Sequence, residues 1–210
     1  MKTALIPDVT GVLLAGGKSR RMGQDKRFLA VGDETLFARS LAVLRSVFER
    51  VVIVIAQDSP SIESDVLVFR DLIPDCGSLG GLYTGLKQAG THWVFAVACD
   101  MPFLEPGTIK HFVALKDEGD VVMAKLQNGF QPMHALYHRN CLPVMEQLIQ
   151  AKDFTIHRVV DHPSLHARLI MPAELARLDP DERSFYNINT PDDLAAAREI
   201  HGQAVKPSSS

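Results

Sequence analysis

Short, almost fully apolar runs alternate with helical patterns through the first 125 residues or so, and this alternation constrains the fold more than any other feature of the chain. The runs have the length of strands, and their continuous apolar character is typical of strands covered on both faces. Strands that alternate with helices form parallel sheets through crossover connections. We therefore expect an α/β protein in which a mostly parallel central sheet lies between two layers of helices.

The apolar pattern also gives approximate bounds for each element. Strands are expected at Val9–Ala15, Val51–Ala56, Val66–Phe69, Trp93–Ala98, Asp120–Ala124 and Met133–Tyr137. Helices are expected at Glu34–Glu49, Leu82–Ala89, Pro106–Lys116, Cys141–Ala151 and from Pro191 to about Ile200. The last helix has a clear start, with Thr190 as N-cap, Pro191 at the first helical position and Asp193 as the capping-box acid. Residues 1–205 are expected to form one domain, and the polar residues 206–210 a disordered tail.

Composition excludes several classes of partner. The chain has 210 residues with 22 basic and 25 acidic side chains, so its formal net charge of −3 offers no overall positive field for a nucleic acid. The longest apolar runs, Val51–Ala56 and Trp93–Cys99, are far shorter than the roughly 20 residues of a membrane-spanning helix. Pro7 and Asp8 interrupt the only early apolar stretch, so we expect no signal peptide. No nucleic-acid or membrane partner is therefore expected, and a monomer is the default oligomeric state.

Cysteine usage indicates the compartment. The chain has three cysteines, which are widely separated and form no CxxC pair: Cys76, Cys99 and Cys141. This pattern favours reduced thiols over disulfides or a structural zinc site. We expect a cytoplasmic protein.

The strongest chemical signal is the segment that follows the first strand, residues 14–26, with the sequence LAGGKSRRMGQDK. Its paired glycines, Gly16 and Gly17, allow backbone N–H groups to approach an anion closely. It also carries four cationic side chains within nine residues: Lys18, Arg20, Arg21 and Lys26. The segment is neither a Walker loop nor a GxGxxG dinucleotide loop. A solvated basic loop is the alternative, but two glycines directly after a buried strand favour a phosphate-binding loop.

Three polar or glycine-rich segments follow strands, namely Gly16–Lys26, Gly77–Gly81 and Cys99–Pro102. In an α/β sheet the ligand lies beyond the carboxyl ends of the strands, so these segments are expected to converge on one crevice. We expect Gly77–Gly81 to be a flexible loop ahead of the helix at Leu82. Asp100 follows the most apolar strand and precedes a proline, a setting that suits a Mg²⁺ ligand, although a turn or helix cap is the alternative.

The segment 14–26 reads Leu-Ala-Gly-Gly-x-Ser-x-Arg-Met-Gly-x-Asp-Lys, which resembles the signature of nucleotidyltransferases that activate small phosphorylated molecules. More closely, it is similar to the MobA-type molybdenum cofactor guanylyltransferases, and Gly17 and the Asp25-Lys26 ending favour this branch. The resemblance runs from about Val9 to Ala197. It includes further matching segments at Gly77–Leu82, Cys99–Phe103, Gln131-Pro132, Ala135–Tyr137 and Asn187–Leu194.

The resemblance implies a three-layer α/β/α Rossmann-like nucleotidyltransferase fold and transfer of GMP from GTP to molybdopterin, with pyrophosphate released and Mg²⁺ as cofactor. It implies catalytic roles for Lys26, Arg21 and Asp100, with Asp100 as the metal ligand. The implied GTP-binding residues are Leu14, Ala15, Gly16, Gly17, Lys26, Asp71, Gly80 and Asp100. The implied molybdopterin-side residues are Gln131, Pro132, Asn187 and Asn189. Chaperones of molybdoenzymes and other proteins of cofactor biosynthesis are implied partners.

The sequence departs from the family pattern at two places. Ser78 replaces the usual proline of the base loop, and Met133-His134 replaces a more apolar pair on the strand that faces the pterin. Asp71 and the two asparagines also have a simpler interpretation as cap or turn residues.

Two other functions stay open. One is a cytidylyltransferase or another nucleotidyltransferase that acts on a pterin or on a sugar or alditol phosphate. The other is a non-catalytic nucleotide-binding module, against which the presence of Lys26 and Asp100 argues. A phosphate monoester has a second pKa of about 6 and is largely dianionic at neutral pH, so direct attack on a triphosphate needs no general base. The histidines and cysteines indeed show no nucleophile–base spacing.

Overall fold

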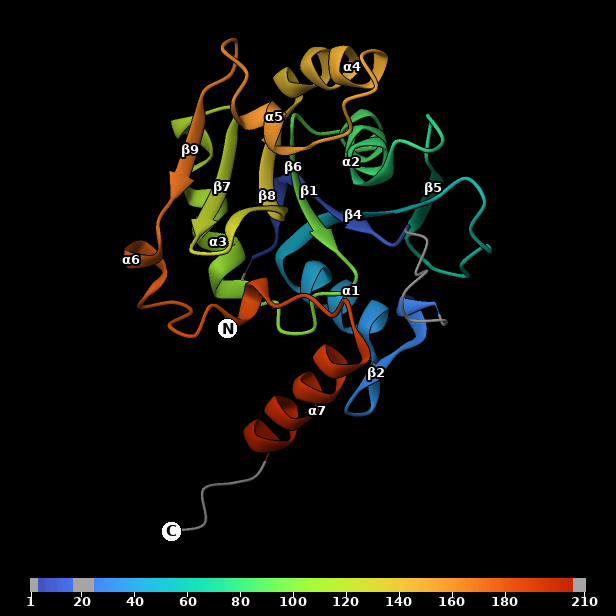
Figure 1. Cartoon of the computed structure of the whole chain (residues 1–210), viewed down its shortest axis with the longest axis vertical. Coiled ribbons are helices and arrows are strands. Elements are labelled where there is room, and N and C mark those ends of the chain that lie inside the picture. Colours follow the sequence, from blue (N-terminus) through green and yellow to red (C-terminus); the bar gives the residue numbers. More distant parts are fainter. Residues whose placement is uncertain (1–3, 17–24, 206–210) are drawn as a thin grey trace.

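The computed structural model describes residues 4–16 and 25–205, and a seven-stranded sheet runs through the middle of this part of the chain (Figure 1). The strand order is β5-β4-β1-β6-β8-β7-β9. The strands are β1 (Ile6–Leu14), β4 (Phe48–Ile55), β5 (Leu67–Arg70), β6 (Trp93–Ala98), β7 (Val121–Leu126), β8 (Gly129–His138) and β9 (Ala167–Ile170). Only β8 is antiparallel to its neighbours β6 and β7, and the other pairings in this sheet are parallel. The predicted α/β fold with a mostly parallel central sheet is confirmed.

Helices cover both faces of the sheet and complete the three layers (Figure 1). One face carries α1 (Leu36–Val47) and α3 (Pro106–Ala114), and the other carries α2 (Gly77–Gln88), α4 (Leu142–Gln150) and α5 (His157–Val160). Outside these layers are α6 (Pro172–Leu175), α7 (Pro191–Val205) and four 3₁₀ turns, at Lys26–Phe28, Lys116–Glu118, Arg139–Cys141 and Arg183–Phe185.

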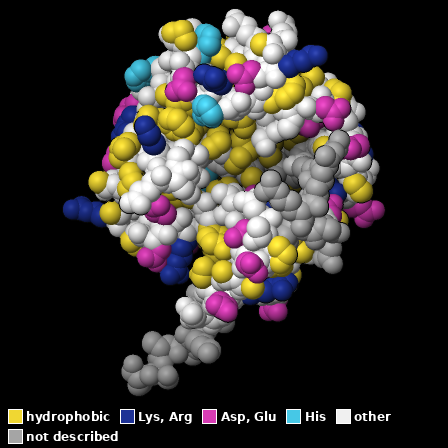
Figure 2. Space-filling view, viewed as in Figure 1, with side chains coloured by type: hydrophobic (Ala, Val, Ile, Leu, Met, Phe, Trp, Pro, Cys, Tyr) yellow, Lys and Arg dark blue, Asp and Glu magenta, His cyan; other side chains and the backbone are white. Residues whose placement is uncertain are grey.

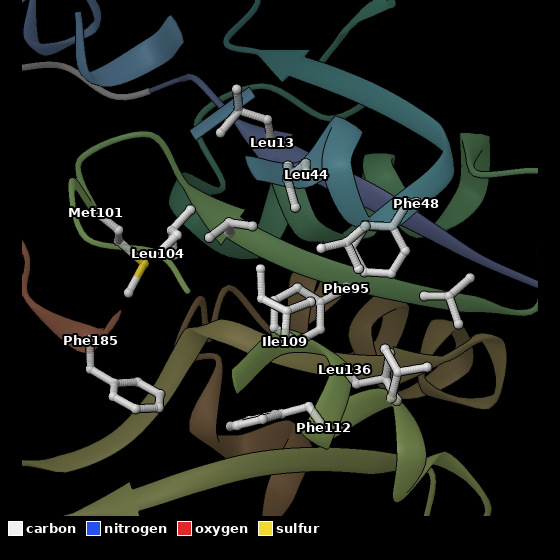
Figure 3. Packing of buried hydrophobic residues seen from close by; sticks show 14 of the residues in the cluster. Leu13, Leu44, Phe48, Phe95, Met101, Leu104, Ile109, Phe112, Leu136 and Phe185 are labelled. Carbon is white, nitrogen blue, oxygen red and sulfur yellow. The ribbon is translucent and has the colours of Figure 1, made fainter. Parts of the chain in front are cut away.

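Aromatic side chains fill the core between the sheet and the α1/α3 layer (Figure 3). Phe48 and Phe95 stack with ring centroids 6.0 Å apart, and Phe112 from α3 meets Phe95 edge-on at 5.8 Å. Leu13 and Leu44 are fully buried in the same cluster. Burying one such side chain contributes about 1.5–3 kcal/mol, so this core fixes the sheet against its helices and with it the positions of the strand ends.

Helix α7 lies beside a small two-stranded sheet made of β2 (Ala30–Val31) and β3 (Glu34–Thr35) (Figure 1). Its start matches the predicted capping box, because Asp193 N–H donates to Thr190 Oγ1 at 3.1 Å while Asp193 Oδ2 accepts the Thr190 N–H at 2.8 Å. The helix continues to Val205, beyond the predicted end near Ile200. A separate apolar cluster that includes Leu29, Leu36 and Leu194 joins this region to α1.

Several element boundaries differ from the sequence prediction, and two of the differences bear on the core and the site. Helix α1 ends at Val47, and β4 already begins at Phe48, a residue expected in the helix. Helix α2 begins at Gly77, so Gly77–Gly81 is its first turn rather than a flexible loop. Three glycines disfavour a helix, but full burial of Leu79 outweighs that cost, since packing supplies most helix stability in proteins.

The β2–β3 hairpin, β9 and the short helices α5 and α6 were not predicted, because segments of two to four residues are too short to show a hydrophobic period.

The three cysteines are buried and free, as predicted for reduced thiols. In the ranges 4–16 and 25–205, none of the helices combines the length and the hydropathy needed to span a bilayer.

Candidate active site

A cavity of about 720 Å³ lies where the carboxyl ends of β1, β4, β5 and β6 meet the start of α2. Its size is within the range of small-molecule sites. The face seen in Figure 2 is hollowed near its centre, where hydrophobic side chains gather between the upper helices and α7. The cavity lining includes residues from all three predicted segments: Gly16, Lys26, Gly77, Ser78, Gly81, Cys99 and Asp100. The predicted convergence of these segments is therefore confirmed for the described residues.

Backbone hydrogen bonds hold the floor of the cavity together. Ala15 N–H donates to the Val54 carbonyl at 2.8 Å, and Cys99 N–H donates to the Leu14 carbonyl at 3.1 Å. At Gly16 a Cβ atom would lie 2.7 Å from the Ala56 backbone nitrogen, a distance that real Cβ atoms do not reach. Glycine is therefore required at this position if β1 and β4 are to end side by side.

Lys26 and Asp100 form the charged centre of the cavity. Lys26 Nζ lies 3.0 Å from Asp100 Oδ2 and 3.0 Å from Asn189 Oδ1, so it donates to both. The side chains of the ion pair are 17% and 19% exposed. Lys26 and Asp100, predicted for the nucleotide site, thus meet here, and Asn189, predicted for the molybdopterin side, contacts the same lysine.

The second oxygen of Asp100 is buried, and no donor from the described residues reaches it. A buried carboxylate oxygen without a donor costs free energy unless a ligand supplies the missing interaction. Carboxylate oxygens are the preferred ligands of Mg²⁺, which commonly takes only one or two of them and fills its other positions with phosphates and water. Asp100 therefore fits the divalent cation that its position suggests. No group of three or more metal-ligating side chains is found within residues 4–16 and 25–205.

Asp71 follows β5 at another part of the cavity wall. Its Oδ1 is buried and accepts no hydrogen bond from the described residues, while its backbone carbonyl accepts one from the Gln57 side chain at 2.7 Å. Burial, followed by the charge of Asp58, raises the pKa of Asp71 to about 6. Gly81 lies against this carboxyl group, since a Cβ there would be 3.5 Å from Asp71 Oδ1 and 3.3 Å from Leu14 Cδ2.

Other predicted site residues are distributed unevenly around the cavity. Leu14, Ala15 and Asn187 line the cavity as predicted. Gly80 does not, because it packs against the Cys76 side chain, and Gly81 lines the cavity instead. Asn187 donates to the Phe185 carbonyl at 2.9 Å, the turn role considered as its alternative.

The predicted pterin-side residues on β8 do not line the cavity. The Gln131 side chain is buried and donates to Asn128 Oδ1 and to the Gly129 carbonyl in the β7–β8 turn. The Pro132 carbonyl accepts from the Tyr137 hydroxyl, and Met133 is the residue of this strand that reaches the cavity. Gly17 and Arg21 lie outside the described residues.

Sequence reasoning missed several residues of the cavity wall: Arg27, Gln57, Asp58 and Asp75. Gln57 and Asp58 could have been found, because they follow a buried strand just as Asp71 and Asp100 do. Asp75 lies just before α2 with a φ of 59°, a left-handed conformation that cannot be predicted from the sequence at this residue.

Cys99 is the only cysteine in the described wall of the cavity, and it is not a nucleophile. Burial raises its pKa to about 12, and the negative charge of Asp100 adds to this effect. The thiol therefore stays protonated at neutral pH, in agreement with a reaction that uses no enzyme nucleophile.

The lysine–aspartate pair and Gly16 lie at the strand ends of a mostly parallel sheet, and comparisons with known proteins show that the protein is a nucleotidyltransferase. A profile of the MobA-like NTP transferase domain matches residues 11–168, and the chain belongs to that family. It is 36% identical to the molybdenum cofactor guanylyltransferase of Desulfosudis oleivorans over 90% of this chain and 94% of the relative. It is 31% identical to the molybdenum cofactor guanylyltransferase of Syntrophotalea carbinolica over 88% of both chains. The crystal structure of molybdopterin-guanine dinucleotide biosynthesis protein A from Archaeoglobus fulgidus superposes with a TM-score of 0.82, at 25% identity, over 92% of this chain and 99% of that one.

Proposed function

We propose that this protein transfers GMP from GTP to molybdopterin, which forms the guanine dinucleotide form of the molybdenum cofactor and releases pyrophosphate. The observation that carries the proposal is the pairing of Lys26 with Asp100 at the strand ends, with one Asp100 oxygen buried and open to a further ligand. The relatives named as molybdenum cofactor guanylyltransferases support the choice of substrates.

The reaction is a direct displacement. An oxygen of the molybdopterin phosphate forms a bond to the α-phosphorus of GTP, the bond between that phosphorus and the bridging oxygen breaks, and pyrophosphate leaves with the electron pair. A phosphate monoester is already largely dianionic at neutral pH, so no side chain has to remove a proton. Holding the two substrates in line and stabilising the charge of the transition state together supply the rate, as in other phosphoryl transfers.

Charge neutralisation is the main task of the site, because two polyanions must approach one another. Lys26 would donate to phosphate oxygens from its position beside Asp100, and Arg21, which lies outside the described residues, is the candidate for a second cation. The Gly16 backbone lies at the carboxyl end of β1, where it would contact the phosphates, whereas the Ala15 N–H already donates to the Val54 carbonyl. Asn189 keeps Lys26 in place through the hydrogen bond to its Nζ.

Asp100 would hold Mg²⁺ through its buried Oδ1, with GTP phosphates and water as further ligands. The bound ion would supply positive charge that offsets the repulsion between the substrates and the charge on the leaving pyrophosphate. Asn187, beside Asp100 on the cavity wall, is a candidate contact for the acceptor substrate.

The guanine base lies at the wall formed by Asp71 and the first turn of α2. Carboxylate oxygens accept hydrogen bonds, and guanine presents two neighbouring donors on its Watson–Crick edge, N1–H and N2–H₂, whereas cytosine presents one donor and two acceptors there. A buried acceptor left without a donor costs about 1–3 kcal/mol, which corresponds to roughly ten- to hundredfold selectivity.

A nucleotide panel tests the proposal. The protein is incubated with molybdopterin, Mg²⁺ and either GTP, CTP, UTP or ATP, and both pyrophosphate and the dinucleotide product are measured. The proposal requires the highest kcat/KM with GTP and one pyrophosphate per dinucleotide. Preference for CTP would instead assign the protein to the cytidylyltransferases, and binding of GTP without any turnover would make it a nucleotide-binding module.

A further inference from the structure

Asp25 and Arg27, the two neighbours of Lys26, are joined by an ion pair with three hydrogen bonds between their side chains. Arg27 Nε donates to both carboxylate oxygens of Asp25 at 2.9 Å, and Arg27 Nη2 donates to Oδ2. The Arg27 backbone N–H also donates to Asp25 Oδ1 at 3.1 Å, which caps the 3₁₀ turn Lys26–Phe28. Side chain and backbone therefore hold the same carboxylate, and the backbone of Lys26 is enclosed between them.

Arg27 is buried although it carries a charge. Only 4% of its surface is exposed, while the Asp25 side chain is 35% exposed, and both residues line the cavity. Arg27 Nη1 also contacts the Pro60 carbonyl at 3.5 Å. A buried arginine is rare unless it is paired, so its position depends on Asp25.

The pair has two consequences for the cavity. Because Asp25 and Arg27 hold the residues on both sides of Lys26, they restrict the direction in which the lysine leaves the backbone, toward Asp100 and Asn189. In addition, an unpaired carboxylate at Asp25 would repel the phosphates of a nucleotide, and the guanidinium of Arg27 offsets this charge.

We propose that Arg27 is a positioning residue, which acts through Asp25 to direct Lys26 toward Asp100 and to neutralise a carboxylate in the wall of the triphosphate site. The inference rests on the proposed function in one respect, that the cavity takes a nucleoside triphosphate. It does not depend on the identity of the acceptor substrate.

The chain offers a matched control. Arg45 and Asp65 form the same two-pronged pair, with Nη1–Oδ1 and Nη2–Oδ2 distances of 2.9 and 2.8 Å, but their side chains are 50% and 67% exposed and lie outside the cavity. Arg45→Met therefore removes an equivalent ion pair without touching the site. We expect its affinity for GTP to stay within about twofold of the parent protein, since exposed pairs contribute little.

The first measurement is the dissociation constant of GTP with Mg²⁺, by calorimetry, together with kcat and KM for transfer. Arg27→Met should weaken GTP binding and lower kcat/KM by about 10- to 100-fold, the range expected when a catalytic group is misplaced. Asp25→Asn/Arg27→Met should recover a large part of the GTP affinity, because it removes the uncompensated charge. Recovery of affinity separates charge compensation from simple loss of packing.

A second comparison tests whether Arg27 acts through Lys26. In the Lys26→Ala background, Arg27→Met should lower kcat by less than about threefold, because residues in one network are not additive. Full activity of Arg27→Met, or an equal loss of kcat with and without Lys26 and no recovery in the double variant, would overturn the proposal.

If Arg27→Met does not fold, as judged by thermal unfolding, Arg27→Lys gives the same test. It keeps the positive charge but cannot form the two-pronged contact, so kcat should fall more than GTP affinity. Unchanged kcat in Arg27→Lys would contradict the positioning role. Failure of the wild type to form a dinucleotide with molybdopterin would refute the proposed function alone, since the GTP affinities of the variants still report on the ion pair.

Discussion

Asp71 and Asp100 occupy equivalent places in the fold, yet their surroundings differ. Each follows a parallel strand, β5 and β6, and each has one buried oxygen without a donor from the described residues. The two strands are three steps apart in the sheet, about 14 Å at the usual strand spacing. Asp100 is paired with Lys26 at 3.0 Å, whereas the nearest charge that affects Asp71 is the like charge of Asp58.

The difference shows that a position at a strand end makes a residue available to the ligand but does not decide its role. Lys26 donates to Asp100 Oδ2 while Oδ1 has no donor from the described residues, an arrangement that suits the proposed role of Asp100 in holding a cation among phosphates. Burial raises the pKa of Asp71 to about 6, which suits an acceptor for N–H groups of a base. On the proposed function, the neighbours of the two acids assign Asp100 to the phosphates and Asp71 to the base.

The largest expected effect is at Asp100. Asp100→Asn removes the charge but keeps the shape, so transfer with Mg²⁺ should fall by at least about a hundredfold in kcat while thermal unfolding stays close to that of the parent. Asp65→Asn, on the exposed surface, is the control. Activity of Asp100→Asn within twofold of the parent would remove this residue from the site.

The second largest effect is expected for Lys26→Ala. Loss of the lysine leaves Asp100 without its cation and the phosphates without a donor, so kcat/KM for GTP should fall by about a hundredfold. Lys87, which pairs with Glu146 away from the cavity, is the matched control for removing a lysine. Equal kinetics for the two alanine variants would mean that Lys26 does not contact the nucleotide.

A smaller effect, confined to GTP binding, is expected at Asp71. Asp71→Asn keeps one acceptor oxygen but adds an N–H₂ donor that faces the donors of guanine, so KM for GTP should rise by about tenfold with little change in kcat. Steady-state kinetics at saturating molybdopterin separates the two parameters. A fall in kcat with unchanged KM would place Asp71 near the reacting phosphorus and break the division of the cavity.

The smallest effect concerns stability. The pKa of Asp71 rises from 3.8 to about 6 on burial, so between these pH values the folded protein binds the proton more tightly than the unfolded chain. Its contribution to the free energy of unfolding is complete below about pH 4 and is lost as the pH rises through about 6. The wild type should therefore lose about 1 kcal/mol relative to Asp71→Asn over this range, a value reduced for solvent screening. Urea unfolding at pH 4.5 and pH 7 checks it, and identical pH dependence in both proteins would show that Asp71 is not desolvated.

Much of the architecture could be predicted from the sequence because its strands are apolar on both faces. Trp93–Ala98 was predicted with the bounds that the structure shows, and the capping box at Thr190 was correct. The start of α2 could not be predicted, because the burial of Leu79 against the sheet outweighs the low helix propensity of its neighbouring glycines.

The candidate site was predictable where a polar residue follows a strand, as Asp71 and Asp100 do. It was not predictable where a contact joins distant segments, as in the hydrogen bond between Lys26 and Asn189, residues that only the folded sheet and α7 bring together. The Asp25–Arg27 pair was also hidden, since a charged residue such as Arg27 in a basic loop gives no sign that it will be buried.

The most direct test of the account is the stoichiometry of the transfer itself. Purified protein is mixed with molybdopterin, GTP labelled at the α-phosphorus, and Mg²⁺, and the label is followed by chromatography. The account predicts that the label moves into a molybdopterin–GMP dinucleotide, one per pyrophosphate released, and that Asp100→Asn abolishes this transfer. Label that stays in GTP with the wild type, or moves equally well with Asp100→Asn, would contradict it.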